Sequence, residues 1–159
     1  MEIETLARAV SHELKRQGLM LVTAESCTGG WVAQIITSVA GSSEWFERGF
    51  VAYTNLAKRE MLGVKTTILS RYGAVSEQTA RAMAEGALTH SHAQVALAIT
   101  GIAGPSGGTP EKPVGTVCFA WAGKKRDTSS IKQVFSGDRE SVRRQAVATA
   151  LQGALDFIR

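Results

Sequence analysis

Histidine, cysteine and long apolar runs are all scarce in this chain of 159 residues, which contains three histidines and two cysteines. No apolar run reaches the roughly 18 residues that a membrane-spanning helix needs, so the sequence predicts no membrane partner. The two cysteines, Cys27 and Cys118, lie far apart and do not make a disulfide framework. We therefore expect a reducing, cytoplasmic compartment.

The three histidines are poorly placed for catalysis. His12 lies in the first predicted helix, and His90 and His92 lie two residues apart at the end of another, so they share no helical face. None of them follows a predicted strand, where α/β proteins collect their ligand-binding turns. A Ser-His-Asp triad and a histidine-rich metal site are both disfavoured, and we expect neither a metal nor a cofactor.

Basic residues outnumber acidic ones by 18 to 14, which gives a formal net charge of +4, but they are dispersed. The densest groups are residues 124–126 and 143–144. Neither group alternates with aromatic side chains as nucleic-acid surfaces do, so we expect no direct nucleic-acid partner. A mildly basic surface still favours a phosphorylated small molecule.

Apolar segments of helical and strand length alternate along the chain. Residues 95–100 are an uninterrupted apolar run, typical of a central strand buried on both faces. The other expected strands are residues 19–23, 49–54, 114–122 and 131–135, and the expected helices are residues 3–17, 31–39, 55–62, 77–90 and 139–157. This alternation predicts an α/β fold, a three-layer α/β/α sandwich with a mixed, mostly parallel sheet, in a single domain over residues 1–159.

Polar turns follow three of the expected strands, at residues 24–30, 53–55 and 101–108. In open α/β sheets, ligands bind beyond the carboxyl ends of the strands, so we expect these turns to gather at one edge. Residues 101–113 hold all three prolines and form the longest irregular stretch. That segment is the best candidate for a binding loop or a lid.

The first of these turns holds three candidate nucleophiles, Ser26, Cys27 and Thr28, followed by Gly29 and Gly30. Glycines let backbone N–H groups approach a ligand closely, so the turn can cradle an oxyanion or a phosphate at a helix N-terminus. The alternative is that the hydroxyl groups only cap the helix. The thiol can likewise be a small buried filler.

A serine nucleophile in this turn needs a base other than histidine. Lys58 lies just inside the helix that follows the second turn and is the obvious amine. Burial or neighbouring positive charge would have to lower its pKa before it could accept a proton near neutral pH. An ordinary exposed helix lysine is the alternative.

Six motifs along the chain carry a family resemblance. They are AESCTGG at residues 24–30, GFVAYTNLAK at 49–58, GAVSE at 73–77, TGIAGP at 100–105, KPVGTV at 112–117 and FSGDR at 135–139. In this order they resemble the CinA C-terminal domain family over essentially the whole chain, and especially its stand-alone nicotinamide mononucleotide deamidases. Each motif is weak alone, but six in the right order are specific.

The resemblance implies hydrolysis of the carboxamide of nicotinamide mononucleotide, giving nicotinate mononucleotide and ammonia by a Ser/Lys mechanism. The family's nucleophile falls on Ser26, its base on Lys58 and its accessory tyrosine on Tyr53. A homodimer is also implied, and the apolar pair Trp45-Phe46 is a candidate for its interface.

The implied reaction also predicts which groups bind the substrate. We expect backbone N–H groups around Thr28, Gly29 and Gly30 to stabilise the oxyanion. The ribose phosphate needs N–H donors and a cation. The candidates are the turn of Gly101, Ile102, Ala103 and Gly104 together with Arg139, and Arg143 is a weaker candidate one helical turn further on.

Two other functions remain open at the level of sequence. The first is a catalytically silent nucleotide-binding or regulatory module of the same competence-associated family, against which the intact Ser26 and Lys58 argue. The second is an amidase for a different small carboxamide, since the residues that select the substrate cannot be placed in space from the sequence.

Overall fold

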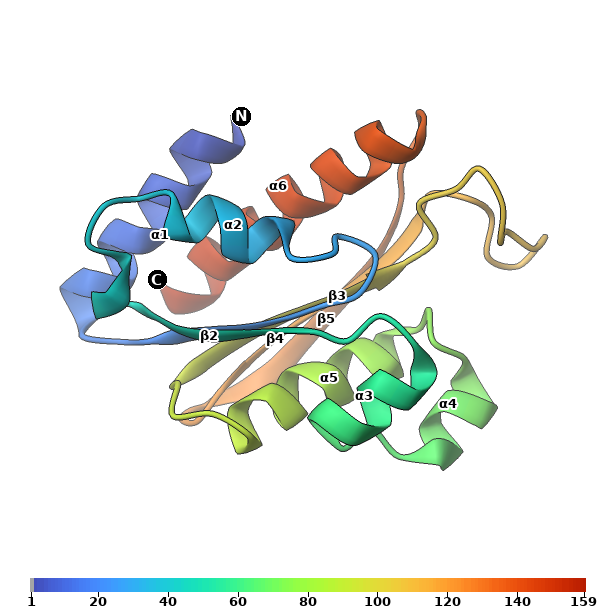
Figure 1. Ribbon diagram of the computed structural model, residues 1–159, viewed down its shortest axis with the longest axis horizontal. Coiled ribbons are helices and arrows are strands. Elements are labelled where there is room, and N and C mark those ends of the chain that lie inside the picture. The colour runs from blue at the N-terminus through green and yellow to red at the C-terminus, as the bar shows by residue number, and fades with distance from the viewer. Residues whose placement is uncertain (1) are drawn as a thin grey trace.

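A five-stranded mixed sheet lies between two layers of helices in the computed structural model, which describes residues 2–159 (Figure 1). The strands are β1 (Leu21–Glu25), β2 (Phe46–Val51), β3 (Val95–Gly101), β4 (Thr116–Gly123) and β5 (Arg126–Val134). The helices are α1 (Ile3–Gln17), α2 (Trp31–Thr37), α3 (Asn55–Leu62), α4 (Thr66–Tyr72), α5 (Glu77–Thr89) and α6 (Arg139–Ile158), with a short 3₁₀ helix at Ser42–Glu44.

The strand order is β2-β1-β3-β4-β5. β1 pairs in parallel with β2 and β3, whereas β4 pairs antiparallel with β3 and β5. All strands but β4 therefore run in one direction, and β4 and β5 form the expected hairpin. The predicted α/β/α architecture with a mixed sheet is confirmed.

The two faces of the sheet carry side chains of different size. Along β3, Val95, Leu97 and Ile99 pack in a core with α1, α2 and α6. The alternate residues Ala96 and Ala98 pack in a second core with α3, α4 and α5. Because β-strand side chains alternate between faces, one apolar run supplies both cores. Figure 1 shows the two groups of helices on opposite sides of the sheet.

The first strand begins two residues later than predicted. Gly18 adopts a left-handed conformation with φ of 67°, and the N–H of Leu19 donates to the carbonyl of Leu14 at 2.9 Å. Leu19 thus closes α1 in a Schellman-type turn rather than starting the strand. At the other end β1 extends to Glu25, which pairs with both neighbouring strands.

The bounds of other elements also differ from those predicted, and one helix was missed. β2 covers Phe46–Val51 instead of 49–54, and β5 starts at Arg126 instead of 131 because the hairpin turn at 124–125 is tight. The helix α4 was not predicted. Its residues include two adjacent threonines with low helix propensity, and among them only Leu69 is buried, so the sequence shows little helical periodicity.

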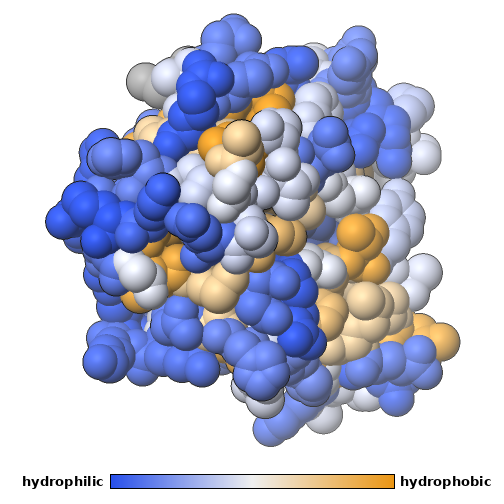
Figure 2. Space-filling view, turned by 60° about the vertical axis from the view of Figure 1, so that its left-hand side comes forward, coloured by the Kyte–Doolittle hydropathy of each residue, from blue (hydrophilic) through white to orange (hydrophobic). Residues whose placement is uncertain are grey.

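The proposed interface at Trp45-Phe46 is also wrong in part. Trp45 is only 4% exposed and belongs to the core under α1 and α2, while Phe46 is half-buried. Large apolar side chains are exposed instead at Val51, Tyr53 and Leu56, among others. On the face that Figure 2 shows, hydrophobic side chains form separate areas among hydrophilic ones. No helix within residues 2–159 is long and apolar enough to cross a membrane.

A glycine makes the close approach of α3 and α5 possible. A Cβ added to Gly86 would overlap the backbone carbonyl of Leu62 at the end of α3. We predict that Gly86→Ala lowers the free energy of unfolding by about 1–3 kcal/mol, although alanine is the better helix former by roughly 1 kcal/mol. Urea denaturation measures the change. Thr89→Ala, at an exposed position of the same helix, serves as the control and should change it by less than about 0.5 kcal/mol. A stabilised Gly86→Ala protein would contradict this packing.

Candidate active site

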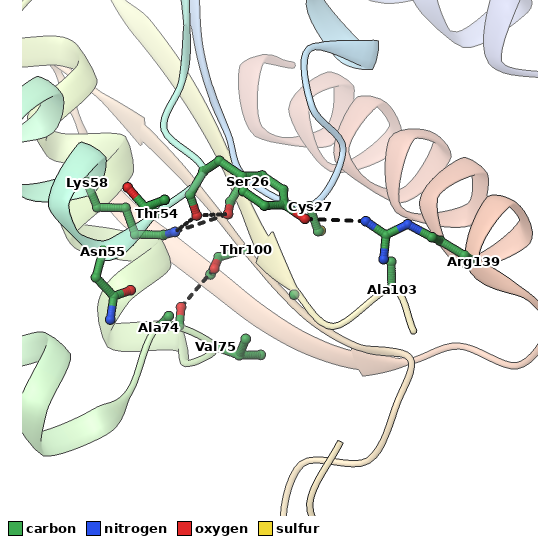
Figure 3. A pocket seen from close by; sticks show the side chains of 12 residues that line it. Ser26, Cys27, Thr54, Asn55, Lys58, Ala74, Val75, Thr100, Ala103 and Arg139 are labelled. Atoms are coloured by element: carbon green, nitrogen blue, oxygen red, sulfur yellow. Dashed lines mark hydrogen bonds between the residues drawn. The ribbon is translucent and has the colours of Figure 1, made fainter. Parts of the chain in front are cut away.

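A pocket of about 320 Å³ opens beyond the carboxyl ends of β1, β2 and β3 (Figure 3). Its walls come from the turns after these strands, the start of α3, the segment before α5 and the start of α6. The lining residues are Ser26, Cys27, Tyr53, Thr54, Asn55, Lys58, Ala74, Val75, Thr100, Gly101, Ala103 and Arg139. The expected gathering of turns at one sheet edge is thus observed.

Ser26 and Lys58 meet at one end of this pocket. The Lys58 Nζ lies 3.0 Å from the Ser26 Oγ and donates a second hydrogen bond, of 2.9 Å, to the backbone carbonyl of Tyr53. The Ser26 hydroxyl lies 3.2 Å from the same carbonyl. Lys58 is 2% exposed and Ser26 is 6% exposed. The alternative of an ordinary exposed helix lysine is therefore wrong.

The local structure explains how Lys58 reaches Ser26. Thr54 caps α3, with its hydroxyl accepting from the N–H of Ala57 at 3.0 Å, so the helix starts at the sheet edge. Lys58 lies one turn into this helix, and helical side chains point back toward the N-terminus. Its ammonium is thereby directed at the end of β1, where the backbone N–H of Ser26 is held by the carbonyl of Ile99 at 3.0 Å.

Burial acts on both titratable groups near the serine. It lowers the pKa of Lys58, because removal from water disfavours the charged ammonium. It raises the pKa of Cys27 to about 12. A lowered pKa suits a proton acceptor, and the raised pKa keeps the Cys27 thiol protonated at neutral pH. The Lys58 Nζ is hydrogen-bonded to the Ser26 Oγ, so the geometry supplies a base to the serine and favours Ser26 over Cys27.

The glycine turn after Ser26 bonds to neighbouring backbone and lies outside the pocket wall. The N–H of Gly29 donates to the carbonyl of Ser26 at 3.1 Å, and Thr28, Gly29 and Gly30 do not line the pocket. In the first turn of α2, the N–H of Trp31 donates to the Thr28 carbonyl at 3.1 Å, and those of Val32 and Ala33 donate to the Glu25 carboxylate at 2.9 and 3.1 Å. The anion at this helix N-terminus is thus the protein's own carboxylate.

Arg139 lies at the opposite side of the pocket from Lys58 (Figure 3). Its guanidinium donates to the carbonyl of Gly104 at 2.7 Å and lies 3.3 Å from the Tyr53 hydroxyl. Gly101 and Ala103 line the pocket, whereas Ile102 and Gly104 do not. The turn that was expected to bind phosphate therefore contributes to the pocket in two ways. Gly101 and Ala103 form part of its wall, and the Gly104 carbonyl holds Arg139 in place.

Arg143 does not line the pocket. Its guanidinium donates to the backbone carbonyls of Cys27 and Thr28, at 3.1 and 3.2 Å. These bonds hold the back of the serine turn. They orient Arg143 away from the pocket that a substrate would occupy.

Two parts of the site were missed from the sequence. Ala74 and Val75 form a wall, and the Ala74 carbonyl accepts from the Thr100 hydroxyl at 2.8 Å. The motif at residues 73–77 was the available signal, but no chemical group in it suggested a role. Glu25 was also missed, because it precedes α2 by six residues in the sequence and reaches the N–H groups of this helix only through the fold of the turn. Within residues 2–159, no three His, Cys, Asp or Glu side chains cluster closely enough to hold a metal ion.

Comparisons with known proteins agree with the motif pattern. The family described as CinA C-terminal domain matches residues 3–158. The chain is 54% identical to the nicotinamide-nucleotide amidohydrolase PncC of Escherichia coli (strain K12), covering 95% of this chain and 92% of the relative. It is 52% identical to the protein of that name from Enterobacter agglomerans, covering 99% and 96%. A crystal structure of a competence/damage inducible protein, CihA from Agrobacterium tumefaciens, superposes with a TM-score of 0.97 at 47% identity and covers 100% of this chain and 97% of that one.

Burial of Lys58 makes stability depend on pH. Because the pKa of Lys58 is lower in the folded chain than in the unfolded one, the lysine costs stability at neutral pH, and the cost falls as pH rises toward the unfolded value of about 10.4. We predict that Lys58→Met is more stable than wild type at pH 7 and that its advantage shrinks by pH 10. Urea denaturation at both pH values measures this, with the exposed Lys132→Met as the control. An advantage that grows with pH would contradict the prediction.

Proposed function

Because this chain belongs to the CinA C-terminal domain family, we propose that it is a nicotinamide-nucleotide amidohydrolase that converts nicotinamide mononucleotide to nicotinate mononucleotide and ammonia. The observation that carries the proposal is the hydrogen bond of 3.0 Å between Lys58 and Ser26 inside a pocket. Relatives that are 52–54% identical to this chain over nearly its whole length carry that activity in their names. Residues 1–159 act as a single catalytic domain in this proposal.

The proposed reaction is a two-step acyl transfer. Neutral Lys58 accepts the proton of Ser26 as the Oγ attacks the carboxamide carbon, and it then returns the proton to the departing ammonia. A water molecule next attacks the acyl-serine and gives a proton to Lys58. Lys58 returns that proton to the Ser26 Oγ as the bond between the acyl carbon and Oγ breaks and nicotinate mononucleotide leaves. The Tyr53 carbonyl, 2.9 Å from the Lys58 Nζ, stabilises the ammonium that forms in each step.

The oxyanion of the tetrahedral intermediate needs N–H donors. The Gly29 N–H is already bonded to the Ser26 carbonyl, so it is not one of them. We assign the role first to the N–H of Cys27, which follows the nucleophile and belongs to the pocket wall. The N–H groups of Thr28 and Gly30 are the remaining candidates in this turn.

The remaining pocket groups suit a nucleotide with an aromatic ring. Ala74, Val75 and Ala103 supply apolar contact for the pyridine ring. Among residues 2–159, the Arg139 guanidinium bonds to the Gly104 carbonyl and the Tyr53 hydroxyl and to no carboxylate, so a phosphate gives it a charged partner. Tyr53 then has two roles, since its hydroxyl orients Arg139 and its carbonyl holds Lys58.

We further propose that the protein works as a homodimer in the cytoplasm. Val51 at the end of β2 and Leu56 in α3 are about half exposed, and both lie within three residues of Tyr53 along the chain. Exposed large apolar side chains are candidates for an interface. They replace Trp45 as the candidate contact surface.

The first test compares amides. Purified protein should release ammonia from nicotinamide mononucleotide much faster than from nicotinamide or its riboside, with EDTA present throughout.

Ser26→Ala should lose nearly all turnover, and Cys27→Ala should keep most of it. The opposite ranking would identify a thiol enzyme, and a need for an added divalent ion would exclude this mechanism. Binding of the nucleotide without hydrolysis would favour a silent regulatory module.

The second test concerns the lysine. A proton acceptor must be neutral part of the time, which arginine, with a pKa above 12, cannot be. Lys58→Ala and Lys58→Arg should both lower kcat by roughly 10²–10⁴-fold, while calorimetry still detects nucleotide binding. A Lys58→Arg enzyme with near-normal kcat would show that the lysine only binds the substrate.

A further inference from the structure

The turn that carries Ser26 is held by two charged side chains that do not line the pocket. On one side, the Glu25 carboxylate is 1% exposed and accepts three hydrogen bonds. They come from the Thr28 hydroxyl at 2.6 Å and from the N–H groups of Val32 and Ala33. Glu25 therefore joins the end of β1 to the beginning of α2.

On the other side, Arg143 reaches the same turn from α6. Its Nε donates to the Cys27 carbonyl and its Nη2 to the Thr28 carbonyl, at 3.1 and 3.2 Å. The Thr28 carbonyl also accepts from the N–H of Trp31 at 3.1 Å, so Arg143 gives it a second hydrogen bond and ties both carbonyls to α6. A planar guanidinium supplies two N–H groups at the required spacing.

Thr28 connects the two charged residues. Its side chain donates to Glu25 while its carbonyl accepts from Arg143, and it is fully buried. Gly29 and Gly30 follow with φ values of 61° and 102°. Glycine loses more conformational freedom on ordering than any other residue, so this turn needs fixed points on both sides.

We propose that Glu25 and Arg143 are positioning residues, which align the nucleophile by fixing the turn through Thr28 and do not contact the substrate. They keep the Ser26 Oγ at hydrogen-bond distance from Lys58. The inference rests on the proposed function for the identity of the reaction, and on the geometry of the turn for the alignment of Ser26. A misplacement of about 1 Å at a reacting atom can cost about 10²-fold in rate.

Arg143 and Arg144 form a matched pair for the test. Both guanidinium groups lie over the Trp31 ring, at 5.5 and 5.4 Å from its centroid, but only Arg143 bonds to the turn. Arg143→Met should lower kcat for nicotinamide mononucleotide by about 10–100-fold with KM changed less than about threefold. Arg144→Met should leave both constants near wild type. Arg143→Lys should fall between, because an ammonium can still donate to one carbonyl.

A substrate-binding role for Arg143 predicts a different pattern. Loss of a phosphate contact would raise KM for the mononucleotide and leave the slow reaction of the riboside unchanged. A positioning residue instead lowers turnover of both compounds by a similar factor. Glu25→Gln adds a second comparison, because its NH₂ group cannot accept from the backbone N–H groups, and it should likewise lower kcat rather than raise KM.

Hydrogen exchange followed by mass spectrometry tests the alignment without any substrate. Arg143→Met should speed amide exchange in residues 26–33, and Arg144→Met should not. If the wild-type protein hydrolyses none of the amides, the proposed function fails, while the exchange comparison still decides the positioning role. Equal exchange and equal kcat in the two arginine variants would overturn the inference, as would a change confined to KM.

Discussion

The site depends on one buried hydrogen bond, between the Lys58 Nζ and the Ser26 Oγ. Burying an ammonium is costly unless polar groups replace its water shell. Here the Tyr53 carbonyl and the serine hydroxyl take that role, and both are neutral. Two neutral acceptors stabilise a charged lysine less than a carboxylate does, so the amine is shifted toward its uncharged form. Burial of Lys58 thus lowers the stability of the fold at neutral pH and, at the same time, makes the amine a better proton acceptor.

The rest of the fold brings these two residues together. Alanines on one face of β3 and β4 let the helical layer of α3, α4 and α5 approach the sheet, while Gly86 lets α5 approach the end of α3. That approach places the start of α3 beside the end of β1. Larger side chains on the other face, such as Phe119 and Trp121, form the core with α1 and α6. The close layer positions Lys58, and the layer with larger side chains positions the turn of Ser26 through α2 and α6.

The charged side chains around the site have two different roles, because some hold the turn of Ser26 and one lies in the pocket wall. Glu25 occupies the N–H groups at the start of α2, so this helix end stabilises the turn and does not recruit an external anion. Arg143 satisfies carbonyls of the turn, and Arg139, one helical turn earlier, lies in the pocket wall. Two arginines on one face of α6 thus have different partners, and spacing along the helix decides which of them faces a substrate.

The amino-acid sequence alone determined the order of helices and strands apart from α4, because hydrophobic periodicity and caps act over a few residues. The buried run of β3, the bounds of α3 and the start of α6 follow from such local signals. It also singled out Ser26 and Lys58 as candidates by their types and by the turns that hold them. Their meeting across 32 positions of sequence, the burial of Lys58 and Trp45, and the partners of Glu25 and Arg143 were decided only by the tertiary structure. Burial and hydrogen-bond partners depend on which elements pack together, and a local pattern carries no information on that choice.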